Sequence, residues 1–203
     1  MAAPTKKRAT YQDVLDAPEH VVAEILNGVL YLSPRPALPH ASVSSALGGE
    51  LYGFDRGRGG PGAWLILDEP ELHHGDDIVV PDLAGWRRER LPAVDEAPYL
   101  TLAPDWVCET LSPSTERLDR KDKLPFYAAF GVRYVWLVSP RQRTIEVLRL
   151  ENGRWFLLGV YGGDLPVRIE PFDAIELDLE ALWRDVPPLP TRASEGALEY
   201  GGY

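Results

Sequence analysis

Hydrophobic and polar positions in the first quarter of the chain predict a helix, a hairpin and a second helix. Residues 10–17 have a short helical pattern with Thr10 as the N-cap residue. Residues 21–33 contain an Asn-Gly pair between two apolar runs, which is the strongest local signal for a β-hairpin. Apolar residues then recur at helical spacing over residues 40–54, which predicts the second helix.

Three strand patterns follow in the middle of the chain. They cover residues 63–73, 78–86 and 106–111, which are rich in apolar and β-branched or aromatic side chains. The first of them is interrupted at Pro70, which predicts an edge strand or a bulge, because proline cannot donate a ladder hydrogen bond. Residues 87–104 show little periodicity and are expected to form a long excursion over the surface.

A charged segment after the third strand leads into another helix, and Pro125 constrains where that helix begins. Proline is tolerated in the first helical turn, where the backbone N–H groups have no intrahelical partner. The helix is therefore expected to begin near residues 120–122, with Asp119 as a candidate cap and Gly131 as the residue after its end. This places Lys123 in the first turn, at the positive end of the helix dipole.

The last part of the chain predicts one more core strand and a terminal hairpin. Residues 133–139 are strongly apolar, residues 144–150 and 154–160 are two strands around an Asn-Gly turn, and residues 178–183 suggest a short helix. The order of elements predicts an α/β (α+β) fold, in which helices flank a mixed sheet and antiparallel hairpins are added at both ends.

Length and composition predict one domain in a reducing compartment. We expect a disordered terminus over residues 1–9, a single domain over 10–185, and a mobile proline-rich tail over 186–203. No apolar run approaches the roughly 18 residues of a membrane span. The chain has one cysteine, Cys108, so it can form no internal disulfide, and a cytoplasmic location fits best.

The net charge of −10 argues against a broadly basic nucleic-acid-binding surface. Residues 113–143, however, carry seven basic and three acidic side chains, a net charge of +4, so the rest of the chain carries −14. This segment is either a contact surface for nucleic acid or a solvated helix face with ordinary salt pairs. Only four of the 21 basic residues are lysine, which draws attention to Lys123, because lysine and arginine are not equivalent at a site.

The candidate chemistry begins with Glu109, a carboxylate in the middle of an apolar strand. Its burial is costly unless the carboxylate is paired, hydrogen-bonded or bound to a metal. Asp82 lies on the preceding core strand, and two neighbouring carboxylates repel each other unless a cation lies between them. Oxygen ligands suit Mg²⁺ or Mn²⁺, and with Lys123 nearby these are the parts needed for phosphodiester hydrolysis. The plainer alternatives are a turn or cap role for Asp82 and, for Glu109, a structural carboxylate whose burial is tolerated because it is paired or hydrogen-bonded.

Several short motifs share a resemblance that spans residues 21–150. The chain resembles the bacterial putative restriction endonuclease family of the PD-(D/E)XK nuclease superfamily. This resemblance implies a restriction-endonuclease-like core and Mg²⁺-dependent cleavage of DNA. It is carried by Pro81-Asp82, by Glu-Thr-Leu-Ser-Pro-Ser-Thr at residues 109–115, by Asp119, Lys123 and Tyr127, by Gly-Val-Arg-Tyr-Val-Trp-Leu-Val at residues 131–138, by Ala-Glu-Ile-Leu-Asn-Gly at residues 23–28, by Leu-Ser-Pro at residues 32–34, and by His40.

Transferred to this sequence, the resemblance implies that Asp82 and Glu109 are the metal ligands and that Lys123 completes the catalytic set. The superfamily usually places its lysine two residues after the glutamate, but that position here is Leu111. The resemblance therefore implies that the lysine has moved to the following helix. Glu24 would be an accessory acid near the metal, with a solvated hairpin charge as the alternative.

Two functions remain open at the level of the sequence. One is a Mg²⁺- or Mn²⁺-dependent endonuclease acting on DNA, with an RNA-directed nuclease as a variant. The other is a catalytically silent binding or assembly module with a nuclease fold, which the acidic composition and the displaced lysine favour. A homodimer or higher homo-oligomer is expected, because cutting both strands needs two active sites or two events, and no membrane partner is expected.

Overall fold

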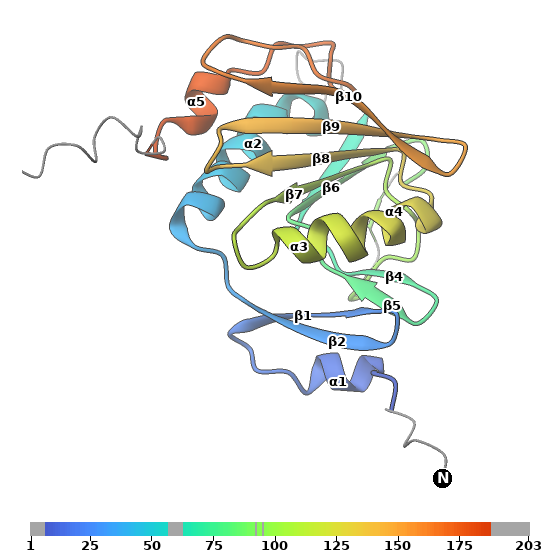
Figure 1. The fold of residues 1–203 in the computed structure, drawn as a ribbon. Coiled ribbons are helices and arrows are strands. Elements are labelled where there is room, and N and C mark those ends of the chain that lie inside the picture. The colour runs from blue at the N-terminus through green and yellow to red at the C-terminus, as the bar shows by residue number, and fades with distance from the viewer. Residues whose placement is uncertain (1–6, 57–62, 92, 95, 188–203) are drawn as a thin grey trace, which may run out of the picture.

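The computed structural model describes residues 7–56, 63–91, 93–94 and 96–187, and its centre is a six-stranded mixed sheet (Figure 1). The strand order is β10-β9-β8-β7-β6-β3; β7 and β8 are parallel, and every other neighbouring pair is antiparallel. The predicted fold class, a mixed sheet flanked by helices, is confirmed. The strands are β3 (Trp64–Asp68), β6 (Leu83–Arg87), β7 (Trp106–Thr110), β8 (Tyr134–Ser139), β9 (Thr144–Glu151) and β10 (Arg154–Gly162).

A second, four-stranded antiparallel sheet lies beside the first, with the order β2-β1-β5-β4. The predicted N-terminal hairpin belongs to this sheet rather than to the mixed one. Its turn is formed by Asn27 and Gly28, whose positive φ angles of 55° and 75° are what a tight hairpin turn requires. The strands are β1 (Val21–Leu26), β2 (Val29–Pro34), β4 (Leu72–His74) and β5 (Asp77–Val79).

Two prolines divide two of the predicted strands between the sheets. The sequence predicts one interrupted strand over residues 63–73 and another over 78–86. In the structure each is two strands: the first is β3 and β4, and the second is β5 and β6. Pro70 and Pro81 lie at the crossings, where a residue without a backbone N–H costs no ladder hydrogen bond. The expected edge strand or bulge is thus a passage from one sheet to the other.

Helices cover both faces of the mixed sheet. The helices α2 (Leu38–Arg56) and α5 (Leu179–Trp183) lie on one face, over a core rich in tryptophan that includes Trp106 and Trp136. The helical segment made of α3 (Glu116–Leu118), a π-helical turn (Asp119–Lys123) and α4 (Leu124–Phe130) covers the other face. That second core also takes in apolar residues of the small sheet, so the two sheets share it. The short helix α1 (Tyr11–Leu15) packs against β1.

The helix that carries Lys123 begins earlier than the sequence predicts. Its first residue is Glu116 rather than a residue near 120–122, so Lys123 lies in the middle of the helical segment and not at its positive end. The prediction failed because Pro125 sits directly after a π-helical turn. In a regular α-helix its ring would clash with the carbonyl four residues earlier, and the i→i+5 geometry of the π turn interrupts that pattern. Gly131 ends the helix as predicted, with φ of 93°.

The C-terminal elements are those predicted, namely the β9–β10 hairpin and α5. The side chain of Asp178 caps α5 by accepting a hydrogen bond of 3.0 Å from the N–H of Ala181. Of the expected terminal tails, residues 1–6 and 188–203 lie outside the described residues, and Val186 packs into the core. Within the described ranges, no helix combines the length and the apolar composition needed to cross a membrane.

Two glycines, Gly131 at the end of α4 and Gly49 inside α2, offer a matched test of the end assigned to α4. Neither would bring an added Cβ within 4 Å of another group, but only Gly131 has a positive φ. We expect Gly131→Ala to lower the free energy of unfolding by about 1–2 kcal/mol, because an L-residue is strained in this conformation. We expect Gly49→Ala, inside α2, to raise it by about 0.5–1 kcal/mol. Urea unfolding of both variants measures the difference, and equal effects would contradict the assigned helix end.

Candidate active site

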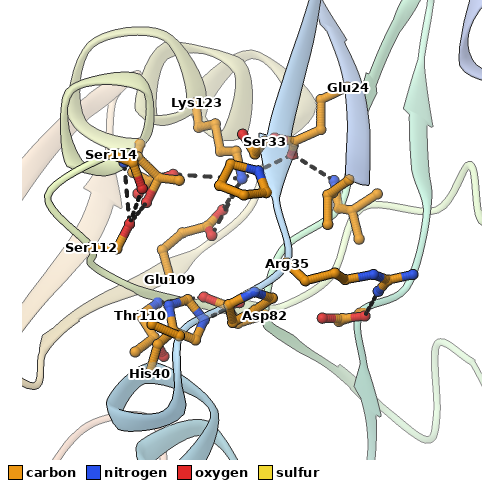
Figure 2. A pocket seen from close by; sticks show the side chains of 18 of the residues that line it. Glu24, Ser33, Arg35, His40, Asp82, Glu109, Thr110, Ser112, Ser114 and Lys123 are labelled. Atoms are coloured by element: carbon orange, nitrogen blue, oxygen red, sulfur yellow. Dashed lines mark hydrogen bonds and ion pairs between the residues drawn. The ribbon is translucent and has the colours of Figure 1, made fainter. Parts of the chain in front are cut away.

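A cavity of about 280 Å³ opens at the junction of the two sheets, and all four site residues predicted from the sequence line it. Glu24 comes from β1 of the small sheet, Asp82 directly precedes β6, Glu109 lies in β7, and Lys123 ends the π-helical turn. Figure 2 shows these four side chains converging from separate elements. The fold therefore brings together residues that are up to about a hundred positions apart in the sequence.

Lys123 is at the centre of the buried charges. Its Nζ lies 2.8 Å from Oε1 of Glu24, 3.2 Å from Oε1 of Glu109 and 3.5 Å from Oδ1 of Asp119. The residue is only 4% exposed. Burial alone would lower the pKa of the ammonium, but the three carboxylates outweigh that effect and raise it well above its usual value. The side chain therefore remains a cation at neutral pH.

Glu109 points from the strand toward the helix that covers it. Burial raises the pKa of its carboxyl well above the usual value; Lys123 opposes this shift, and the nearby carboxylates, Asp119 first, add to it. The hydroxyl of Tyr127, one turn beyond Lys123 in the helix, also donates a hydrogen bond to Glu109. Glu109 is thus both ion-paired and hydrogen-bonded within the protein, and these contacts do not exclude a catalytic role.

Asp82 is held by two donors at the edge of the cavity. Its Oδ1 lies 2.7 Å from Nε2 of His40, and its Oδ2 accepts a hydrogen bond of 2.6 Å from the backbone N–H of Thr110. Its side chain is 15% exposed, so its carboxylate remains accessible from the cavity. Both contacts come from distant elements, so the residue is more than a local turn or cap.

Glu24 and Asp119 both contact Lys123. Glu24 also accepts a hydrogen bond of 2.9 Å from the backbone N–H of Val80, which connects β1 to the end of β5. Asp119 does not act as the helix cap proposed from the sequence, because the helix has already begun three residues before it. Burial raises the pKa of Asp119 to about 6, despite the opposing effect of Lys123.

The donor set suits a magnesium ion. Acidic side chains outnumber basic ones around the cavity, and the neighbouring carboxylates, Asp82 among them, raise the pKa of Glu109, so a divalent cation would relieve a real repulsion. Mg²⁺ is commonly held by one or two carboxylates while it keeps several waters. Within the part of the chain that the structure describes, no three His, Cys, Asp or Glu side chains form a ready-made cage for a metal. Asp82 and Glu109 match the smaller, water-completed type of site.

Comparison with known proteins agrees with the observed fold. The model of the Uma2 family, described as "Putative restriction endonuclease", matches residues 9–180. The chain belongs to the Uma2 family. Among solved structures, a protein from Anabaena variabilis ATCC 29413 described as a putative nuclease belonging to DUF820 has a similar fold, with a TM-score of 0.70 and 22% identity over 87% of this chain and 98% of that one. A comparison with curated proteins gives no match. Membership of the Uma2 family supports a nuclease function.

Three residues of this Uma2 site were not assigned a role from the sequence. They are His40, Thr110 and Tyr127, which contact the two candidate metal ligands. Tyr127 could have been found from its position four residues after Lys123, because such residues share a helix face. The contact of Thr110 is made by its backbone N–H, so no property of its side chain could have indicated it.

The raised pKa of Asp119 predicts a pH-dependent effect on stability. The folded state holds this proton up to about pH 6, whereas the unfolded chain releases it near pH 4, so ionisation of Asp119 destabilises the fold as the pH rises through this window. We expect Asp119→Asn to be more stable than the wild type at pH 8, by on the order of 1 kcal/mol. The advantage should disappear below pH 4. Thermal unfolding in EDTA at both pH values measures it, and an equal effect at both would contradict the shift.

Proposed function

We propose that this protein is a Mg²⁺-dependent endonuclease that hydrolyses phosphodiester bonds of DNA. The observation that carries the proposal is the convergence of Asp82, Glu109 and Lys123 on one cavity, although Lys123 follows Glu109 by 14 residues. Membership of a family described as putative restriction endonucleases supports the same reaction class. Mn²⁺ is expected to substitute for Mg²⁺, because both prefer oxygen ligands.

In this proposal Asp82 and Glu109 hold the metal ion. The bound ion would supply Lewis-acid stabilisation of a phosphoryl oxygen and a water of lowered pKa. The carboxylate of Glu109 has acceptor capacity beyond its contacts with Lys123 and Tyr127, since an ionised carboxylate offers about four lone-pair sites. Tyr127 and the backbone N–H of Thr110 keep the two carboxylates in place.

Lys123 acts as a cation in the proposed reaction. Because its pKa is raised, it is protonated at neutral pH and cannot accept a proton from water. Its ammonium instead stabilises the negative charge that develops on the phosphate and orients the attacking water. Glu24 is a positioning residue in this scheme, since its contact of 2.8 Å holds Lys123 rather than the metal ligands.

Plasmid cleavage tests the proposal. The purified protein with an excess of Mg²⁺ or Mn²⁺ is expected to nick supercoiled DNA and to lose this activity in EDTA. Asp82→Ala and Glu109→Ala should abolish cleavage, and Lys123→Met should lower the rate by about 10²–10³-fold. A labelled RNA of the same sequence, assayed in parallel, separates a DNA-directed from an RNA-directed nuclease.

An acidic residue outside the cavity provides the matched control for this experiment. Asp164 is exposed and far along the chain from the site, so Asp164→Ala is expected to cleave like the wild type. Residual cleavage at equal rates in wild type and Asp82→Ala would point to a contaminating nuclease and would refute the proposal.

A catalytically silent binding or assembly module with a nuclease fold is the second candidate. It is favoured by the state of the site, in which both oxygens of Asp82 and the ammonium of Lys123 already have partners within the protein. Calorimetric titration with Mn²⁺ distinguishes the two. Heat of binding that is lost in Asp82→Ala supports the endonuclease, whereas no heat together with no cleavage supports the silent module.

We also propose that the protein acts as a homodimer, because one active site per chain serves one DNA strand at a time. The outer strand β10 offers a surface for self-association. Phe156, Leu157 and Val160 on this strand are each about half exposed, at 48–56%, and Arg154 is its only charged residue. Light scattering is expected to give twice the mass of the 22.6 kDa chain, and Leu157→Lys should shift the protein toward the monomer. A monomer at all concentrations would refute this.

A further inference from the structure

His40 makes the closest side-chain contact with Asp82, and the packing of the protein does not explain why a histidine is there. It lies in the first turn of α2, and its side chain is 11% exposed. Its Nε2 lies 2.7 Å from Oδ1 of Asp82. Its other ring nitrogen, Nδ1, is buried without a hydrogen-bond partner in the described part of the chain. A buried polar atom without a partner is unfavourable, and an apolar side chain of similar volume would avoid it.

The same helix makes a second polar contact with the site. Ser44 is one turn after His40, so both side chains lie on one face of α2. The hydroxyl of Ser44 is 2.9 Å from the hydroxyl of Thr110, and the backbone N–H of Thr110 donates to the other oxygen of Asp82. His40, Asp82, Thr110 and Ser44 therefore form a ring of contacts that the backbone of α2 closes and that connects α2, the start of β6 and the end of β7. Figure 2 shows three of these residues, His40, Asp82 and Thr110.

This ring fixes both oxygens of the Asp82 carboxylate. One oxygen is held by a side chain and the other by the backbone, so rotation of the carboxylate would break one of the two contacts. Thr110 directly follows Glu109 in β7, so the ring also connects Asp82 to the strand that carries the second candidate metal ligand. Groups that orient a ligand in this way commonly change metal affinity about 10–100-fold when they are removed.

We infer that His40 is a positioning residue that sets the affinity of the site for a divalent cation by orienting the carboxylate of Asp82. The inference rests on the proposed metal-dependent function. His40 contacts neither the substrate nor the metal in this scheme; its Nε2–H donates to Asp82 Oδ1, and the other lone pairs of the carboxylate remain available to the metal.

Three substitutions of His40 separate the effect of its hydrogen bond to Asp82 from the effect of the shape of its imidazole side chain. Glutamine carries a donor the same number of bonds from Cα as Nε2, whereas the donor of asparagine corresponds to Nδ1 and falls short of Asp82. We expect calorimetric titration with Mn²⁺, without DNA, to show about 10–100-fold weaker binding in His40→Leu and His40→Asn. His40→Gln should bind within about threefold of the wild type, because it restores the donor.

The matched control is His74, an exposed histidine in β4 that lies outside the cavity. His74→Leu is expected to bind Mn²⁺ like the wild type. In cleavage assays, the deficit of His40→Asn should shrink as the Mn²⁺ concentration is raised, while that of Asp82→Ala should not. A structural role for His40 would not produce this recovery.

The outcomes separate the inference from the proposed function. Wild-type affinity in all three His40 variants would overturn the inference alone and leave the metal site intact. Equal weakening in His40→Gln and His40→Asn would also overturn it, because the donor would then not matter. Loss of folded protein in all three variants, seen by circular dichroism, would make His40 a structural residue. No Mn²⁺ binding by the wild type would overturn the inference together with the proposed function.

Discussion

The buried ammonium of Lys123 is the interaction on which the arrangement of the site depends. It joins the π-helical turn, which carries both Lys123 and Asp119, to β1 through Glu24 and to β7 through Glu109. Removing charges from water is costly, and a single ammonium does not balance several carboxylates. Burial is the main cause of the raised pKa values of Glu109 and Asp119, and the neighbouring carboxylates add to it. The carboxylates of this site repel one another, and a bound divalent cation would reduce that repulsion.

The position of the lysine follows from the way the helix covers the strand. In β7 the side chain of Glu109 faces the covering helix, and Leu111, two residues later, faces the same side, as alternation along a strand requires. Leu111 is buried in the core shared by the two sheets, together with Phe126 and Tyr127 of α4. A lysine at position 111 would have to fit into that apolar contact. The helix above supplies the ammonium instead, from Lys123, and Tyr127 reaches the same carboxylate from one turn further along.

The sequence predicts most of this fold, and its failures have definite physical causes. Asn-Gly turns, the apolar strand before Ser139 and the glycine end at Gly131 are local signals, and the structure follows them. Pro70 and Pro81 indicate interruptions, but the sequence alone could not show that the chain changes sheets there, because the pairing partners are distant. Pro125 suggested a helix start, and the π turn before it removes the steric reason for one.

For a related reason, the sequence indicates the charged candidates of the site but not the role of His40. Glu109 stands out in the sequence because its charge conflicts with its apolar surroundings, Lys123 because lysine is scarce in this chain, and the family resemblance adds Asp82 and Glu24. His40 does not, since a histidine at a helix start is an ordinary residue until its partner is known. Its contact with Asp82 spans 42 positions and depends on where α2 lies against the sheet. The charged residues of the site can thus be predicted from the sequence, whereas the residues that orient them can be identified only from the fold.

The distribution of charge also bears on how an acidic protein could receive DNA. The segment 113–143 has a net charge of +4, but several of its cations have partners within the protein. Lys123 is buried among carboxylates, Arg120 bonds Glu146 and Glu116, and Arg143 donates to the backbone carbonyl of Val186. Fewer cations than the sequence suggests are therefore free to neutralise phosphates, which is the main source of affinity for DNA. A divalent cation between Asp82 and Glu109 would offset the negative charge of the cavity and allow a phosphate to approach it. In the proposed nuclease, metal binding is then a condition for engaging the substrate as well as for cleaving it.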